Sequence, residues 1–344
     1  MKKKVLVTGG TGYIGSHTVV ELQNAGYDVV IVDNLSNSEA AVIQGIEKIT
    51  GILPAFEEFD LTDKVKTRDF FCRHQDIDSI IHFAAYKAVG ESVQEPLKYY
   101  HNNIGSLLNV LECMKEFKIN NLVFSSSCTV YGQPDILPVT EETPFQPANS
   151  PYGNTKQIAE EIIRDTIYSS DFLKAISLRY FNPIGAHPSA LIGELPIGVP
   201  NNLIPFITQS AFGLRGQIQV YGDDYNTPDG TAVRDYIDVV DLAKAHIVAV
   251  ERLINSKIKK PYEYFNLGTG EGISVLQIIN SFEKSTGIKL DYKIIGRREG
   301  DVEKVWADTS YANSELGWKA ETSLSDTLKY AWKWEEFYRN NLSK

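Results

Sequence analysis

Residues 5–17 read VLVTGGTGYIGSH, and this stretch decides the fold. A short apolar run leads into Gly9, and Gly12 and Gly15 follow at a G-x-x-G-x-x-G spacing where a strand would pass into a helix. Glycine leaves no side chain between the backbone amides and a phosphate, and the N-terminus of a helix attracts negative charge. A glycine-rich turn can join any strand to any helix, so the spacing alone is weak evidence for a nucleotide-binding site. Its position after the first strand, with an acidic residue at the end of the second, predicts a dinucleotide-binding turn.

The acidic residue is Asp33. Its carboxylate can accept hydrogen bonds from the hydroxyls of the adenosine ribose and would repel a 2′-phosphate. Residues 34–40 (NLSNSEA) contain no Arg or Lys that could bind such a phosphate, so NAD is favoured over NADP as the cofactor. Asp60, at the end of the third predicted strand, leaves two alternatives open: it lies by the adenine edge, or it caps the next helix.

Short apolar runs alternate with amphipathic segments as far as residue 181. The runs predict strands at residues 4–8, 28–32, 55–59, 79–83, 121–125 and 174–181. The intervening segments predict helices near residues 13–25, 39–50, 63–74, 96–118 and 152–169. Strands that are separated by helices indicate a parallel sheet with helices on both faces. The predicted fold class is therefore α/β, with a doubly wound parallel Rossmann sheet.

The pattern changes after residue 181. Residues 181–202 are rich in Pro and Gly and predict loops. Shorter elements follow, with helices near 203–213, 240–254, 274–286 and 323–342, and strands at 218–221 and 264–267. These elements predict a smaller C-terminal α/β substrate domain. We expect residues 1–181 to form the NAD-binding domain, rejoined by about 234–260, and residues 182–344 to form the second domain.

Composition narrows the class of protein. The net charge of −10 argues against a nucleic-acid or anionic-membrane surface. Cys72, Cys113 and Cys128 form no C-x-x-C pair, which favours a reducing compartment and argues against disulfides or a bound metal. The N-terminus lacks the apolar segment of about 7–15 residues that a secretory signal requires. No apolar run approaches the roughly 18 residues of a membrane span, so we expect a cytoplasmic protein.

Tyr152 and Lys156 lie four positions apart in SPYGNTK, residues 150–156. The chain has 18 Tyr and 24 Lys in 344 residues, so about one Tyr-x-x-x-Lys match is expected by chance. On a helix the two side chains share a face, and a nearby ammonium would lower the pKa of a phenol, which is near 10. Ser127 stands upstream in VFSSSCTVYG, at the end of a predicted strand where ligands of such sheets bind. In this context we interpret Ser127, Tyr152 and Lys156 as a catalytic set.

Several longer motifs match a known family. They include TGGTGYIGSH, VDNLSNS, HFAAYKAVGESV, NNIGSLLNVL, FSSSCTVYG, SPYGNTK, LRYFNPIGAHPS, GVPNNLIPF, YGDDYNTPDGTAVRDYIDVVDLA, FNLGTG and RREGDVEKVWAD. Through them the chain resembles the extended short-chain dehydrogenase/reductases over nearly its full length, and within that family it is most similar to the UDP-glucose 4-epimerases. The resemblance implies that the second domain binds a UDP-sugar.

The resemblance also implies binding roles for individual residues. Those that would contact NAD are Gly9, Gly12, Tyr13, Ile14, Gly15, Asp33, Asn34, Asn37, Ser38, Asp60, Leu61, Phe83, Ala84, Ala85, Lys87, Asn102, Tyr152, Lys156 and Phe181. Those that would face the sugar are Ser127, Tyr152 and Asn182. Those that would hold the nucleotide diphosphate are Asn202, Tyr221, Arg234, Arg298 and Asp301.

The implied reaction is an internal redox cycle on a UDP-hexose. Tyr152 would remove the proton of the sugar 4-hydroxyl while C4 gives a hydride to NAD. The 4-keto sugar would then turn in the pocket and regain the hydride on its other face, which interconverts UDP-glucose and UDP-galactose. Lys156 would tune Tyr152, and Ser127 would hydrogen-bond the reacting oxygen. The resemblance further implies a homodimer formed through the helices near 91–118 and 152–169.

Three rival functions share this fold. A 4,6-dehydratase would need an acidic pair in the segment where this chain has Cys128 and Thr129, and that segment has no carboxylate. A UDP-glucuronate decarboxylase fits the C-terminal motifs less well. A silent NAD-binding regulator would not need the intact catalytic set. Val305 stands where some relatives carry Tyr, and the smaller side chain predicts room for an N-acetyl group, hence activity on UDP-GlcNAc and UDP-GalNAc as well.

Overall fold

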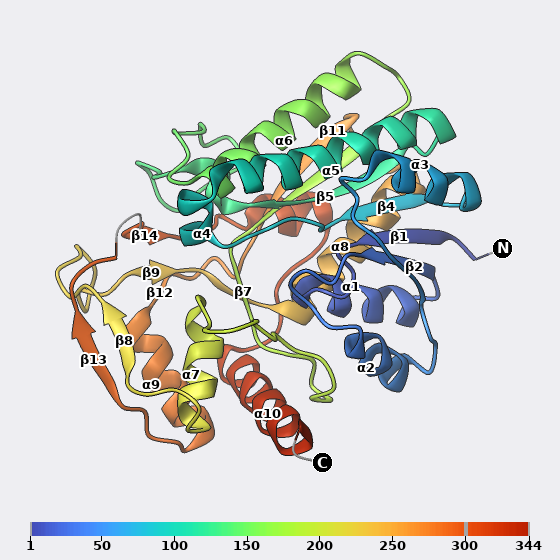
Figure 1. Ribbon diagram of the computed structural model, residues 1–344. Helices are drawn as coiled ribbons and strands as arrows, with labels where there is room; N and C mark the ends of the chain where they lie inside the picture. Colours follow the sequence, from blue (N-terminus) through green and yellow to red (C-terminus); the bar gives the residue numbers. More distant parts are fainter. Residues whose placement is uncertain (1, 299–301, 343–344) are drawn as a thin grey trace.

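A seven-stranded parallel sheet forms the centre of the protein. The computed structural model describes residues 2–298 and 302–342, and Figure 1 shows its arrangement. The strand order is β11-β6-β5-β4-β1-β2-β3. The strands are β1 (Lys4–Thr8), β2 (Asp28–Asp33), β3 (Ala55–Glu58), β4 (Ser79–His82), β5 (Asn121–Ser127), β6 (Lys174–Tyr180) and β11 (Tyr262–Leu267).

Helices cover both faces of this sheet. One face carries α1 (Tyr13–Asn24), α2 (Ala41–Thr50) and α8 (Val239–Ile254); the other carries α3 (Lys64–Arg73), α5 (Pro96–Phe117) and α6 (Pro151–Tyr168). Along β1, Val5 and Val7 join the core under the first set of helices, and Leu6 joins the core under the second. Successive side chains of a strand point to opposite faces, so a strand buried on both faces is apolar throughout. The predicted doubly wound fold is confirmed.

The strand order reverses between β1 and β4. From β1 the chain passes to β2 and β3 on one side, and then returns to β4 on the other. Ligands of such sheets bind beyond the carboxyl ends of the strands at this reversal. Gly9 follows β1, and Phe83 follows β4, so the reversal lies directly between two groups of predicted cofactor residues.

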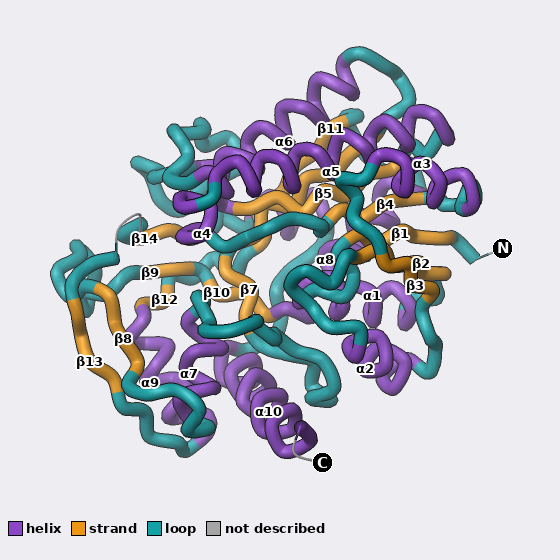
Figure 2. The backbone as a smooth tube through the Cα atoms, viewed as in Figure 1, coloured by secondary structure: helices purple, strands orange, loops and turns teal. Residues whose placement is uncertain are grey.

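Most of the remaining elements pack beside the carboxyl edge of the large sheet (Figure 2), whereas the turn at Ala312–Leu316 packs against α8 and β11. The helices are α4 (Val89–Gln94), α7 (Leu203–Ala211), α9 (Val275–Thr286) and α10 (Leu324–Leu342), with a 3-10 turn at Cys128–Tyr131 and a π-helical turn at Ala312–Leu316. The short strands are β7 (Asn182–Ile184), β8 (Ile218–Tyr221), β9 (Val233–Arg234), β10 (Tyr236–Asp238), β12 (Ile273–Ser274), β13 (Tyr292–Ile295) and β14 (Lys304–Val305). The smaller elements have a separate hydrophobic core, centred on Ile207, Ile278 and Phe282, which packs α7, α9 and α10 together.

The chain returns to the large sheet late in the sequence. Within the segment 234–260 that was expected to rejoin the first domain, α8 packs against α1. The strand expected at 264–267 among the smaller elements lies in the large sheet as part of β11, parallel to β6, with Phe265 opposite Leu178. Within the described residues, no helix combines the length and the apolar character needed to cross a membrane.

Candidate active site

The glycine turn brings β1, α1 and β4 into close contact. A Cβ atom on Gly9, whose φ is +70°, would lie 2.8 Å from the backbone nitrogen of Ala84. A Cβ on Gly15 would lie 2.2 Å from the carbonyl oxygen of Gly9. Gly12 is the N-cap of α1 and, within the described chain, no side chain caps the helix. The free N–H groups of its first turn therefore suit a phosphate.

Asp33, the last residue of β2, hydrogen-bonds to the glycine turn. It is buried, and its carboxylate accepts hydrogen bonds from the N–H of Thr11 (3.2 Å) and of Leu35 (2.9 Å). Ser38 lies against the same turn, because its Oγ is 2.7 Å from Thr11 Oγ1. Asn37 is exposed beside it. The carboxylate thus orders the loop where the adenosine ribose would lie.

Asp60 does not cap the following helix, so that alternative is wrong. The cap of α3 is Asp63, whose side chain accepts from the N–H of Val65 and Lys66. Asp60 instead accepts from Thr62 and, at 3.0 Å, from the side-chain amide of Asn34. Asn34 and Asp60 are thereby linked across the ends of β2 and β3, where the adenine would lie. The next residue, Leu61, is buried in the core under α3 and α5.

A carboxylate not foreseen from the sequence links the middle of the crevice to the loop before α7. Oε1 of Glu194 lies 3.3 Å from Lys87 Nζ and accepts a 2.7 Å hydrogen bond from the side chain of Asn202. Lys87 also lies over the ring of Tyr13. One carboxylate therefore joins residues predicted for the cofactor and for the nucleotide. Its partners come from distant segments, and no local pattern marks it.

Other predicted cofactor residues surround this crevice. Phe83 packs against the ring of His246 at 4.7 Å between centroids, and Ala84 and Ala85 continue from it after β4. Asn102 donates to the side chain of Asn103 at 2.9 Å. Tyr13 and Ile14 form the first turn of α1 beside Gly12.

Ser127 and Tyr152 meet beyond the carboxyl end of β5, and Lys156 lies one helical turn further along α6. Ser127 is the last residue of that strand, and Tyr152 lies in the first turn of α6. All three are buried. Burial, together with the neighbouring Tyr180, raises the pKa of Tyr152 well above its usual range, and a hydrogen bond with Ser127 opposes this shift. The hydroxyl of Thr129, two residues after Ser127, is buried without a partner in the described part of the chain and is available to a ligand.

Lys156 is held by the backbone of β5. Its Nζ donates a 2.6 Å hydrogen bond to the carbonyl oxygen of Ser125 and lies over the ring of Phe124. Burial lowers the pKa of Lys156 to about 8, and the carboxylate of Glu160 opposes this shift. Burial therefore places the titration of this lysine close to neutral pH, as is common for groups that act in catalysis.

Only some of the residues predicted to bind the sugar and the diphosphate lie close to one another. Phe181 and Val305 belong to one small apolar cluster, and Val305 pairs with Arg234 between β14 and β9. Asn182 begins β7, directly after Phe181. Burial raises the pKa of Cys128 to about 12, and the charge of Arg234 opposes this shift, which places the guanidinium near the residue after Ser127.

Among the other predicted diphosphate residues that the structure describes, Tyr221 is half-buried and Arg298 is exposed. Tyr221 ends β8, and the guanidinium of Arg298 lies 5.3 Å from its ring centroid. Asn202 is exposed before α7. Asp301 lies outside the described residues.

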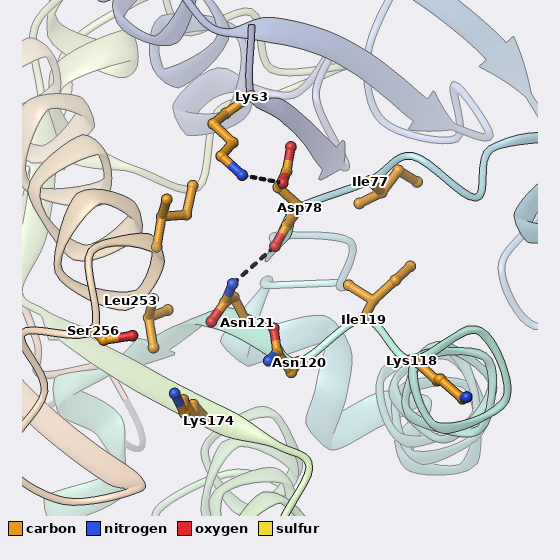
Figure 3. A pocket seen from close by; sticks show the side chains of 11 residues that line it. Lys3, Ile77, Asp78, Lys118, Ile119, Asn120, Asn121, Lys174, Leu253 and Ser256 are labelled. Carbon is orange, nitrogen blue, oxygen red and sulfur yellow. Dashed lines mark hydrogen bonds and ion pairs between the residues drawn. The ribbon is translucent and has the colours of Figure 1, made fainter. Parts of the chain in front are cut away.

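A separate pocket lies at the opposite end of the sheet (Figure 3). It is formed where β4, β5 and β6 begin, by residues such as Asp78, Asn120 and Lys174. Lys3 donates to Asp78 at 2.8 Å, and Asn121 donates to the carbonyl of Asp78 at 2.9 Å. None of the predicted site residues lines this pocket. It lies at the amino ends of the strands, whereas ligands of such sheets bind at the carboxyl ends.

A phosphate-binding turn, a Tyr-x-x-x-Lys pair and a strand-end serine converge on one edge of a parallel sheet. This combination places the chain in the short-chain dehydrogenase/reductase class.

Comparison with known proteins narrows the class. A family model described as GDP-mannose 4,6 dehydratase matches residues 6–330. UDP-glucose 4-epimerase 2 of Arabidopsis thaliana is 50% identical over 97% of this chain and 95% of its own. UDP-glucose 4-epimerase of Bacillus subtilis is 48% identical over 96% of each chain. The chain therefore belongs to the family of that model and, within it, to the UDP-glucose 4-epimerases, as the sequence motifs predicted.

Solved structures agree with this assignment. A UDP-glucose 4-epimerase from Stenotrophomonas maltophila, with bound NAD and formylated UDP-arabinopyranose, has a TM-score of 0.94 and 47% identity. It covers 98% of this chain and 99% of its own. The enzyme from Bifidobacterium longum, in complex with NAD+ and UDP, has the same TM-score, 46% identity and the same coverage.

Proposed function

We propose that this protein is an enzyme that interconverts UDP-glucose and UDP-galactose with NAD as a bound cofactor. The observation that carries the proposal is the contact of Ser127 with Tyr152 beyond β5, with Lys156 one helical turn further along α6, in a chain that matches UDP-glucose 4-epimerases over nearly its full length. The names of the most similar relatives and the ligands of their solved structures support both the substrate and the cofactor.

The residues present fit NAD. The cradle at Gly9 and Gly15 would be filled by any side chain, and the first amides of α1 are free for the pyrophosphate. The carboxylate of Asp33 and the absence of Lys and Arg from residues 34–40 suit an unphosphorylated ribose. NAD, when bound, supplies the reversible acceptance of a hydride from carbon.

The protein's own residues handle the proton. Tyr152 takes the proton of the sugar 4-hydroxyl, and Ser127 donates a hydrogen bond to the same oxygen. A buried phenol resists ionisation, so Tyr152 needs a nearby positive charge to become a phenolate. Lys156, one helical turn further along α6, supplies that charge and binds the carbonyl of Ser125. Arg234, Arg298, Tyr221 and Asn202 hold the nucleotide while the sugar turns.

The proposal is tested by incubating the purified protein with UDP-galactose, without added cofactor, and identifying the product by NMR. UDP-glucose supports the proposal. A 4-keto-6-deoxy sugar would mean a dehydratase, and NAD binding without turnover would mean a regulator. Tyr152→Phe keeps the ring and removes the base, so it should abolish turnover while leaving the fold and the bound NAD unchanged.

Val305 supports a wider sugar range. Its side chain is buried beside Phe181, and a branched aliphatic group leaves more space than a Tyr would. One solved structure, 34% identical with a TM-score of 0.83, is described as the UDP-Glc/GlcNAc 4-epimerase from Campylobacter jejuni. We extend the proposal to UDP-GlcNAc and UDP-GalNAc. Val305→Tyr should abolish turnover of the N-acetylated sugars and spare UDP-galactose; equal loss of both would contradict this extension.

The exposed apolar side chains of α5 bear on how the protein assembles. α5 leaves Leu97 and Leu108 exposed, and these apolar side chains support a homodimer formed through α5 and α6. Light scattering after gel filtration would test it, with Leu97→Glu as the variant expected to yield monomers. We further propose that the enzyme is cytoplasmic, that residues 1–181, rejoined by about 234–260, form the NAD-binding domain, and that residues 182–344 form the UDP-sugar-binding domain.

A further inference from the structure

Asp235 is a carboxylate buried at the back of the site. It follows Arg234, and its side chain has no solvent exposure. Among the described residues no Lys or Arg forms an ion pair with it; hydrogen-bond donors satisfy it instead. Oδ1 accepts from the N–H and the hydroxyl of Thr269, both at 2.8 Å. Oδ2 accepts from the N–H of Gly270 at 3.1 Å and of Ala307 at 3.2 Å.

These bonds join segments that are far apart in sequence. Thr269 and Gly270 lie in the loop after β11, and Ala307 lies two residues beyond Val305 at the end of β14. The carbonyl of Asp235 also accepts from the N–H of Asn182 at 2.9 Å. One residue therefore ties together the backbone that carries Arg234, Asn182 and Val305.

The local β-structure is too short to do this alone. β9, β12 and β14 contain two residues each, so their ladders supply few hydrogen bonds. Strand pairs this short are not stable by themselves. Hydrogen bonds to a buried charged group are stronger than those between neutral groups. The carboxylate therefore adds a cross-link to the pairing of β9 with β14 and to the hydrogen bond from Arg234 to the carbonyl of Glu303, and helps to set the position of Arg234 relative to Val305.

Gly268 and Thr269 leave space for the carboxylate of Asp235 and supply hydrogen bonds to it. A Cβ on Gly268 would lie 2.3 Å from Asp235 Oδ2, so any larger residue would displace it. The hydroxyl of Thr269 adds a second donor to the oxygen that its own N–H already reaches. Within the described chain, no hydrogen bond or ion pair joins Gly268 or Thr269 to Ser127, Tyr152 or Lys156. Their arrangement is explained by the carboxylate they surround.

We propose that Asp235 is a positioning residue for substrate recognition, which holds Arg234 against the nucleotide diphosphate and Val305 against the sugar. This role rests on the proposed function. It predicts that loss of the carboxylate weakens nucleotide binding far more than it slows the chemical step, because Ser127, Tyr152 and Lys156 belong to β5 and α6.

The test is Asp235→Asn in the full chain, with UDP as the titrant in calorimetry and UDP-galactose in the assay. The amide preserves shape but turns a donor toward N–H groups, so the UDP dissociation constant and the KM should rise about tenfold or more. The kcat should change less than about threefold, because the interaction acts on binding rather than on the transition state. The NAD content should be unchanged.

Asp241→Asn is the matched control. Asp241 is equally buried and accepts from the N–H of Glu321 and of Thr322, a segment that carries no predicted site residue. It should lower stability without changing UDP affinity. Thr269→Val removes a single donor and should raise the UDP dissociation constant about two- to fivefold, which provides a second measurement if Asp235→Asn does not fold.

Two results would overturn the inference, and they are distinguishable. If Asp235→Asn or, where it does not fold, Thr269→Val binds UDP as tightly as the unaltered protein, Asp235 is only structural and the proposed function stands. If the unaltered protein itself does not bind UDP, the proposed function fails and this role fails with it.

Discussion

The ion pair between Glu160 and Arg179 allows a sharp prediction about stability. Both side chains are buried, and the pairing is bidentate, with Nη2 donating at 2.6 Å and Nε at 3.0 Å. Ser126 adds a 2.5 Å hydrogen bond to the same carboxylate. Glu160→Gln would keep the shape, turn a donor toward the guanidinium and leave a buried positive charge. Removing one member of a buried pair costs about 3–5 kcal/mol.

The guanidinium of Arg179 also lies 4.2 Å from the ring centroid of Tyr264. This contact does not involve Glu160 and persists in the variant, so it does not change the cost. An Arg side chain cannot lose its proton to escape the unpaired state. We therefore expect Glu160→Gln to lower the free energy of unfolding by about 3 kcal/mol.

The assay is urea unfolding followed by tryptophan fluorescence, with NAD content matched between variants. Glu116→Gln is the control, because Glu116 forms a similar forked pair with Arg68 on the surface, where both side chains are about half exposed. An exposed pair contributes little to stability, because water and salt screen its charges. Glu160→Gln combined with Arg179→Met should recover much of the lost stability, because no unpaired charge remains.

The reasoning would be refuted if Glu160→Gln cost no more than Glu116→Gln, because burial would then not decide the strength of the pair. It would also fail if the double variant were less stable than Glu160→Gln, because the unpaired guanidinium would then not be the source of the cost.

Three other predictions follow from single contacts. Gly15→Ala would place a methyl group 2.2 Å from the Gly9 carbonyl, so the purified protein should lose bound NAD, measured by its absorbance after denaturation. Lys156 has a pKa of about 8 when folded and 10.5 when unfolded, so the folded state binds fewer protons between these values. Stability should therefore rise by up to about 3 kcal/mol from pH 8 to 10.5, and Lys156→Met should remove that rise from the pH profile of the urea midpoint. Asp63→Ala should cost about 1 kcal/mol as a lost helix cap, whereas Asp60→Ala should leave α3 intact by circular dichroism, because Asp60 does not cap it.

Local sequence patterns predicted the frame of the protein. Successive side chains of β1 point to opposite faces of the sheet, so the strand can be recognised from a few consecutive apolar residues. Each glycine of the turn likewise indicates, at its own position, that the backbone needs room or an unusual conformation. Both can be read within a few residues, and the strands from β1 to β6 lie where the apolar runs placed them. The same holds for Tyr152 and Lys156, because a helix brings i and i+4 to one face wherever it forms.

The partners of buried charges could not be predicted in this way. Asp60 and Asp63 are both acidic residues before a helix, and only the observed geometry shows which of them caps it. Glu194 looks like an ordinary loop carboxylate until Lys87 and Asn202 are seen beside it.

The sequence by itself determined the class of fold, the glycine turn after β1 and the spacing of Tyr152 and Lys156, since each depends on neighbours along the chain. Only the tertiary structure decided that β11 completes the large sheet and that Asp235 joins three separate segments behind Arg234. The physical reason is that a buried carboxylate must find donors wherever the fold supplies them, and Thr269 and Ala307 come near Asp235 only when the chain has folded.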